Sequence, residues 1–402
     1  MKAKLALGLF GLVLASQASA QGLYYSGTEA QESIPLKWQV GADYIYDDNV
    51  SPGYGNDESA SSVAPYVGLS FVSVDPQTTW DVYARLGLIY YLDGPDHLDS
   101  TYTTARAGVD FAHRFSERLR ISSINFISYE LEPDYTYGIS SSRSAGEYFY
   151  WQTDNSVGFR WSERFATYTG FRLTGLDYQD VDHNDRFTWT LYNQFRYQLT
   201  PQTVLTAEYR YAQTSGNGAY TDATDHYILG GLEHRFSPTT IGLFRVGAQL
   251  HDVDGGNSYT SPYAEAALNS RVNEQFMVKA FVRYGIENFN TVHVVDGLLT
   301  EFSDRRTLRL GVSGNYSISK RLGLFGGVDY IPTSYEGGHV VATGASVGDR
   351  DEDLINAYIG LSLQFTDNIF GSLTYNHTTS DSDLPRNDYD RNRISVGVRA
   401  EF

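Results

Sequence analysis

Hydrophobic and polar residues alternate along most of this chain with a period of two. The last ten residues, RISVGVRAEF, place apolar side chains at the even positions and polar, charged or glycine residues at the odd positions. Charges at every second residue exclude a transmembrane helix, but they fit a β-strand with one face toward lipid and the other toward water. The pattern predicts a membrane-spanning strand that ends the chain at Phe402.

Eight short polar turns divide the alternating runs. They recur every 36 to 47 residues and begin at residues 75 (DPQT), 116 (SERL), 162 (SERF), 200 (TPQT), 237 (SPTT), 273 (NEQF), 319 (SKRL) and 366 (TDNI). Between successive turns lie two alternating runs and a longer segment rich in Asp, Gly, Ser and Asn. Short turns at one end and long loops at the other are typical of outer-membrane barrels.

The turns also give a strand count. Eight turns imply sixteen strands, and the runs at 37–47 and 393–402 add two. We therefore predict an all-β fold, a transmembrane antiparallel up-and-down β-barrel of about 18 strands, or 16 if one hairpin is counted wrongly. A barrel of this size leaves an aqueous channel unless loops fold inward.

The amino terminus has the features of an export signal: two lysines, an apolar run at 5–15 and small residues before Gln21. The apolar run of about 11 residues is shorter than the roughly 20 that a spanning helix needs. We expect a cleaved signal peptide at 1–20, a periplasmic tail at 21–35 and the barrel at 36–402. This organisation places the protein in the bacterial outer membrane of a Gram-negative envelope.

Composition agrees with a barrel and excludes other classes. The chain has 32 Tyr and 38 Gly, which suits a wall with aromatic girdles. It has no cysteine, so neither disulfides nor thiolate chemistry can be involved. The net charge of -18 argues against a nucleic-acid partner.

The parity of each run sorts side chains between lipid and lumen, because a lipid-facing Arg or Lys at mid-bilayer costs about 2–4 kcal/mol. The predicted lumen-lining residues are Arg85, Arg106, Arg172, Arg196, Arg210, Arg245, Arg283, Arg309, Arg399, Tyr83 and Tyr192. Basic residues outnumber acids on this parity, so we expect a modestly positive wall. In the run at 119–129, alternation does not separate an apolar face from a polar face.

Two interpretations of this wall remain open. The arginines either pair with neighbouring acids and hold the strands together, or form a field that selects anions. The tyrosines either stack on sugar rings or fill the wall and its girdles. The surplus of acids falls in the loops, for example at 93–99, 348–353 and 381–390.

The acidic loops do not form a recognisable metal site. Asp180, Asp182 and Asn184 match the start of a calcium loop, but Asp185 stands where glycine is required and Leu191 where glutamate is required. We predict no metal and no cofactor. No histidines stand at the spacing of metal ligands, so we predict that the protein is not an enzyme.

The expected partners are those of an outer-membrane barrel. They are outer-membrane lipid and lipopolysaccharide, together with the barrel assembly machinery, which would recognise a membrane-assembly signal in the last strand formed by Phe402, Ala400 and Val398. A periplasmic export partner is expected only if the barrel exports a polymer.

The stretch GADYIYDDNV (residues 41–50), the export signal, the hairpin period and the terminal Phe resemble the putative β-barrel porin type 2 family of bacterial outer-membrane proteins. The resemblance implies a porin-like barrel, and some relatives occur in polysaccharide-secretion gene sets. It assigns no role to individual residues.

We therefore expect a porin-like channel for passive diffusion of small hydrophilic solutes. An alternative is an outer-membrane conduit for polysaccharide export. A third is a plugged barrel acting as a surface receptor or adhesin, in which a loop at 287–304 or 333–352 folds into the lumen and blocks it.

Overall fold

The computed structural model describes residues 20–21, 24–25, 33–52, 58–95, 98–132, 146–179, 185–217, 221–256, 258–288 and 291–402. The expected signal peptide lies outside the described residues except for Ala20. Within the described ranges, no helix is long and apolar enough to cross a membrane. A separate pair of two-residue strands, β1 (Ala20–Gln21) and β2 (Tyr24–Tyr25), precedes the main sheet.

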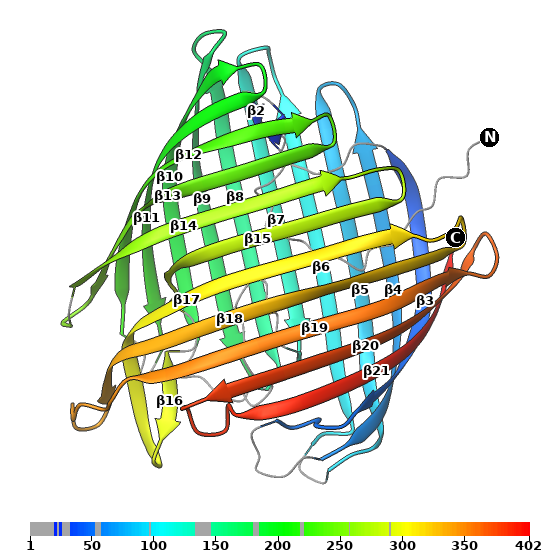
Figure 1. Ribbon diagram of the computed structural model, residues 1–402, viewed down its shortest axis with the longest axis vertical. Helices are drawn as coiled ribbons and strands as arrows, with labels where there is room; N and C mark the ends of the chain where they lie inside the picture. Colours follow the sequence, from blue (N-terminus) through cyan, green and yellow to red (C-terminus); the bar gives the residue numbers. More distant parts are fainter. Residues whose placement is uncertain are drawn as a thin grey trace.

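The rest of the described chain forms one closed antiparallel barrel of 18 strands, as predicted (Figure 1). Each strand pairs with its neighbours in sequence, and one additional short strand, β16, extends the wall beside β17. The strands are β3 (Ile34–Asp47), β4 (Ala60–Val74), β5 (Thr78–Asp93), β6 (Thr101–Arg114), β7 (Leu119–Glu130), β8 (Tyr148–Arg160), β9 (Phe165–Tyr178), β10 (Arg186–Thr200), β11 (Thr203–Gly216), β12 (Ala223–Ser237), β13 (Thr240–Val253), β14 (Ser258–Arg271), β15 (Phe276–Ile286), β16 (Val292–Val295), β17 (Leu298–Ser317), β18 (Leu322–Val340), β19 (Arg350–Gln364), β20 (Ile369–Ser382) and β21 (Tyr389–Glu401).

All eight predicted turns join consecutive barrel strands at one end of the molecule. Their polar residues stabilise the chain reversal locally. In the turn between β6 and β7, for example, the backbone N–H of Leu119 donates to Ser116 Oγ at 3.0 Å. Ser319 and Thr366 accept equivalent hydrogen bonds in two later turns. These side-chain acceptors explain why Ser and Thr recur at the start of the turns.

The two ends of the chain close the barrel. β21 pairs antiparallel with β3, from Arg393 opposite Asp47 to Glu401 opposite Gln39. Trp38 and Phe402 then exchange backbone hydrogen bonds of 3.0 and 2.9 Å. Closure leaves the sheet without an edge, which lipid requires because it cannot satisfy free N–H and C=O groups.

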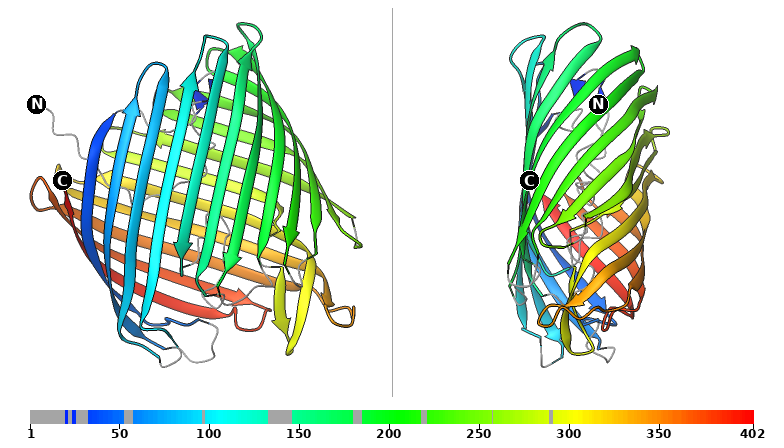
Figure 2. Two further views of the ribbon diagram at one scale, coloured as in Figure 1. Left: turned by 180° about the vertical axis from the view of Figure 1, so that it is seen from behind. Right: turned by 90° about the vertical axis from the view of Figure 1, so that its left-hand side faces the viewer.

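The outer face of the wall is apolar over most of its circumference. Leu86, Val312 and Val398 belong to widely separated strands, and each is more than half exposed, as expected for side chains that face lipid. The barrel is flattened, so it is much narrower in the right-hand view of Figure 2 than in the left-hand view. Strands β3 to β11 form one of its broad faces.

The two loops proposed as plugs are mostly strand. Residues 298–304 belong to β17 and residues 333–340 to β18, and these parts pair with each other, from Thr300 opposite Val340 to Thr307 opposite Thr333. β16 adds a third strand to this extension, which projects beyond the wall in Figure 1. The prediction of loops over these parts was wrong because the extension continues the same ladder past the rim.

Glycines make room for aromatic side chains on the inner wall. Tyr83 on β5 lies against Gly108, its partner on β6, and a Cβ atom added to Gly108 would stand 2.4 Å from the Tyr83 ring. Tyr192 has the same relation to Gly170 on β9. Each ring can therefore lie along the wall, because the neighbouring strand carries no side chain there.

We expect the substitution Gly108→Ala to destabilise the barrel by about 1–3 kcal/mol, because the added methyl group overlaps the Tyr83 ring. The measurement is urea unfolding of the refolded barrel in lipid vesicles. In a Tyr83→Ala background the same substitution should cost much less. Equal costs in both backgrounds would contradict the packing described here.

Candidate functional site: the inner wall

The inner wall carries rows of arginines that pair with carboxylates on nearby strands. All nine predicted arginines and both predicted tyrosines lie on strand faces that point inward. The ion pairs of these arginines are Arg85–Asp43, Arg106–Glu130, Arg172–Asp154, Arg196–Glu233, Arg210–Glu208, Arg245–Glu265, Arg283–Glu287, Arg309–Glu287 and Arg399–Glu401. The interpretation in which arginines hold the wall together is therefore the one that the geometry supports.

The most extensive network joins β11, β13 and β14. Glu265 accepts from Arg245 at 2.5 Å and from Arg210 at 3.3 Å, and Tyr263 donates to the same carboxylate at 2.7 Å. Glu208 pairs with Arg210 and lies 3.8 Å from Arg245. Two arginines thus share two glutamates, so this part of the wall carries no excess charge.

A second group follows along β8 to β12. Arg196, which is fully buried, binds Glu233 through both terminal nitrogens at 2.6 and 2.5 Å. Asp154 accepts from Arg172 at 2.6 Å and from the Tyr192 hydroxyl at 2.7 Å. Tyr192 is therefore fixed to the wall by a hydrogen bond as well as by its fit over glycine.

Arg85, two strands from the chain closure, is more open than these arginines. Arg85 reaches across β4 to Asp43 at 3.2 Å, and its guanidinium lies over the Tyr66 ring at 3.6 Å. Its side chain remains 40 % exposed. Such a stacked, half-exposed guanidinium can still donate hydrogen bonds toward the lumen.

The end of β15 separates from β14 on the lumen side of the wall, although it stays paired with β17 as far as Ile286 opposite Arg306. Pairing between β14 and β15 stops at Ala264 and Tyr284, and continuing the register would place Ile286 opposite Pro262, which has no N–H to donate. The backbone of Ile286 instead exchanges hydrogen bonds of 2.9 and 3.0 Å with the side-chain amide of Gln249 on β13. We call residues 286–288 the inturned segment.

Contacts of Asn288 show how far this segment reaches. Its amide donates to Asp225 on β12 at 2.8 Å and to Thr214 on β11 at 3.3 Å. The segment therefore crosses the inner faces of β14, β13 and β12. Of the two loops expected to fold inward, the first contributes this short piece.

Glu287 fixes the inturned segment to arginines of β15 and β17. Its carboxylate accepts from Arg309 at 2.7 and 2.8 Å, from Arg283 at 2.7 Å and from Arg305 at 3.1 Å. Burial raises the pKa of this carboxyl, but Coulombic attraction to Arg309 and Arg283 outweighs it and holds the pKa well below its usual value. Glu287 is ionised at neutral pH.

Sequence parity missed Glu287, Arg305 and Gln249. Glu287 follows a strand end, where alternation no longer assigns a face. Arg305 and Gln249 reach Glu287 and Ile286 only because β15 separates from β14. The one local signal was Pro262, because proline interrupts pairing within a sheet. With Glu287 and Glu132 also bound to inner arginines, the wall is closer to neutral than predicted.

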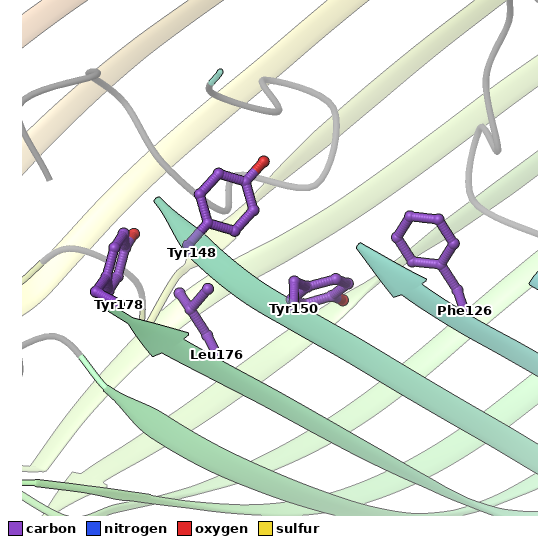
Figure 3. Packing of buried hydrophobic residues seen from close by; sticks show 5 residues of the cluster. All are labelled: Phe126, Tyr148, Tyr150, Leu176 and Tyr178. Carbon is purple, nitrogen blue, oxygen red and sulfur yellow. The ribbon is translucent and has the colours of Figure 1, made fainter. Parts of the chain in front are cut away.

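Aromatic residues form a cluster on the inner wall near the long-loop end of β7, β8 and β9 (Figure 3). Its members are Phe126, Tyr148, Tyr150, Leu176 and Tyr178, and Tyr83 packs against them. All five are nearly fully buried. They act as packing rather than as an open stacking surface. Of the two tyrosines considered as stacking positions for sugar rings, Tyr83 packs against this cluster.

No group of three or more His, Cys, Asp or Glu residues in the described ranges could hold a metal ion. The candidate calcium-loop residues Asp180, Asp182 and Asn184 lie outside those ranges. His251 is bound to Asp225 at 2.9 Å, where it supports the contact made by the inturned segment.

Comparison with known proteins agrees with the resemblance seen in the sequence. Residues 213–402 match the family described as Putative beta-barrel porin 2. No curated protein matches the chain.

Several solved outer-membrane proteins have similar structures. Acinetobacter baumannii OccAB4 is 14 % identical, with 92 % of this chain and 99 % of that chain covered and a TM-score of 0.44. A BenF-like porin from Pseudomonas fluorescens Pf-5 is 12 % identical, with 92 % and 99 % covered and a TM-score of 0.47. Pseudomonas aeruginosa OpdK, solved with vanillate, is 13 % identical, with 91 % and 99 % covered and a TM-score of 0.46.

Removing the charge of Glu287 should release the inturned segment. In Glu287→Gln the buried guanidinium groups of Arg305 and Arg309 lose their carboxylate, which should lower the free energy of unfolding by about 3–5 kcal/mol. The measurement is urea unfolding in lipid vesicles. The matched control is Glu117→Gln, because that glutamate is 91 % exposed in its pair with Arg160. Equal stability of the two variants would contradict this role.

The same contact predicts a pH dependence. Because the folded-state pKa of Glu287 is lowered, its contribution is complete above the unfolded-state value of about 4.3 and is lost as pH falls toward the folded-state value. The stability difference between wild type and Glu287→Gln should therefore be constant from pH 8 to about pH 5.5 and shrink below about pH 4. A difference that shrinks near neutral pH would show that Glu287 is not held ionised.

Proposed function

We propose that this porin-like barrel of the bacterial outer membrane, whose residues 213–402 belong to the Putative beta-barrel porin 2 family, lets small hydrophilic solutes diffuse passively across that membrane. Porins are channels rather than enzymes, in agreement with the expectation from the sequence.

The inner wall supports diffusion of polar solutes. Barrels of 16 to 18 strands generally enclose a water-filled channel, and the described chain closes with 18. Arg85, Arg106 and Arg283 remain between about a third and two fifths exposed, although each is paired with an acid. Their N–H groups can replace hydrogen bonds that a solute loses with water.

The pairing of arginines bears on selectivity. Because each predicted inner arginine is paired with a carboxylate, the wall has only a weak net field, and we expect a modest preference among ions. Around Glu287 three arginines share one carboxylate, so the residual charge there is positive. The observation that carries the proposal is the half-exposed Arg283, which lies beside the inturned segment and binds Glu287 at 2.7 Å. A solute passing this segment meets a guanidinium that keeps donors available.

The test is planar-bilayer conductance of the refolded barrel, with the reversal potential measured in a salt gradient. Wild type should form long-lived open channels. The double variant Arg85→Ala/Arg283→Ala should shift the reversal potential toward cation preference, because it removes two partly exposed positive charges from the inner wall. The matched control is Arg164→Ala, which removes an exposed arginine from a short turn.

A silent bilayer from correctly folded protein would reject free diffusion. Polysaccharide export would then require a periplasmic partner to open the barrel, and a plugged receptor would stay closed with or without one. An open channel with an unchanged reversal potential in the double variant would keep the diffusion function but remove the two arginines from ion selection.

A further inference from the structure

The outer face of four neighbouring strands, β7 to β10, carries a polar patch that interrupts the apolar wall. All its members have short uncharged side chains with hydroxyl or amide groups. We call it the polar wall patch, and it consists of Ser123, Asn125, Thr153, Asn155, Thr169 and Asn193.

Strand parity places these side chains on the lipid-facing side. Ile127 on β7 and Val157 on β8 share their parity, and both are 47 % exposed. The inward positions of the same strands hold buried groups such as Phe126 and Asp154. The ambiguous run at 119–129 is explained, because Ser123 and Asn125 occupy positions where lipid-facing strands carry apolar residues.

The patch lies at mid-height in the wall. On β8, Trp151 precedes it toward the long-loop end, and Phe159 and Trp161 follow it toward the short turns. Trp161 packs edge-on against Phe159, with ring centroids 4.7 Å apart. Aromatic residues form girdles at the two membrane interfaces, so the side chains between them face the hydrocarbon.

Four of the side chains form a closed ring of hydrogen bonds across β7 and β8. Ser123 donates to Asn155 Oδ1 at 2.7 Å, and Asn155 donates to Thr153 Oγ1 at 2.7 Å. Thr153 donates to Asn125 Oδ1 at 2.7 Å, and Asn125 donates back to Ser123 Oγ at 3.0 Å. Asn193 donates to Thr169 on the next pair of strands at 2.5 Å. The patch is an ordered polar surface.

Equivalent heights elsewhere in the described wall are apolar. Examples are Leu86 on β5, Val246 on β13, Ile359 on β19 and Val398 on β21, all about half exposed. Lipid tails offer no hydrogen bonds, so polar groups are disfavoured where the wall faces them. A surface of this kind is suited to contact with protein.

We propose that the polar wall patch is the contact between two copies of this chain, related by a two-fold axis along the membrane normal. Amides and hydroxyls both donate and accept hydrogen bonds, so the neutral patch is complementary to itself. A two-fold contact joins identical patches, as such a surface requires. Interhelical polar contacts in membranes follow the same physical principle.

The shape of the wall fits this partner. The patch lies on the broad face formed by β3 to β11 (Figure 2), so a second copy can approach over several strands. The nine strands of this face, spaced about 4.8 Å apart across about 25 Å of apolar thickness, offer on the order of 1,000 Å². A stable pair needs about 800 Å² on each partner. Ala105 and Ala107, on the outer face of β6, leave room for close approach.

The contact can be tested in the membrane, because the chain has no native cysteine. Oxidation of Asn155→Cys with copper phenanthroline in isolated outer membranes should yield a disulfide-linked dimer. The matched control is Ile359→Cys, at a similar height on the opposite broad face, which should remain monomeric. A dimer from the control but not from Asn155→Cys would overturn the proposal.

The mass of the particle gives a second test. Wild type in a lipid nanodisc or mild detergent should contain two chains, and Asn125→Leu/Asn155→Leu should contain one while keeping heat-modifiable migration. The substitutions replace polar by apolar groups on a lipid-facing wall, so they preserve insertion. A monomeric wild type without cross-links, a double variant that stays dimeric, or a wild type that holds a different protein at this face would each overturn the proposal.

Discussion

Every strand of this barrel depends on closure of the sheet between β21 and β3. In lipid a free strand edge would leave a row of N–H and C=O groups without partners, and each would cost several kcal/mol. The pairing that ends with Trp38 and Phe402 removes that edge. Closure fixes the register of all neighbours, and the register decides which side chains meet inside. The charge pairs, the inturned segment and the polar wall patch all follow from it.

The inner wall shows how charges can line a channel without giving it a strong field. Glu265 and Glu208 share Arg210 and Arg245, and Asp154 is shared by Arg172 and Tyr192. Such networks leave few donors directed toward the lumen, so under the proposed function a solute would meet mainly the arginines that stay partly exposed. Glu287 in the inturned segment shows this double use of an ion pair. Its carboxylate fixes the segment to Arg309 and also accepts a hydrogen bond from the partly exposed Arg283. Stability of the lumen and interaction with the solute therefore use the same side chains.

The outer wall contains a surface, the polar wall patch, whose hydroxyl and amide groups face lipid that cannot form hydrogen bonds with them. The hydrogen-bonded ring of Ser123, Asn155, Thr153 and Asn125 satisfies part of its own polarity and keeps the four side chains in one arrangement. A rigid polar surface loses little conformational entropy on binding. In the proposed dimer, the second barrel contacts polar side chains at lipid-facing positions. Two of them, Ser123 and Asn125, are also the reason why the faces of β7 are difficult to assign from sequence.

The sequence by itself determined the architecture, because a period of two and the spacing of polar turns are local properties. The eight turns, the 18 strands and the inward side of the predicted arginines could all be read from it. Only the tertiary structure decided the pairing of charges, since Lys37 and Glu401 are 364 residues apart and meet only through closure. It also decided the role of Glu287, which depends on β15 separating from β14 near Pro262, and the lipid-facing position of Asn125. Alternation assigns a face to a residue, but register and the bending of strands decide its neighbours.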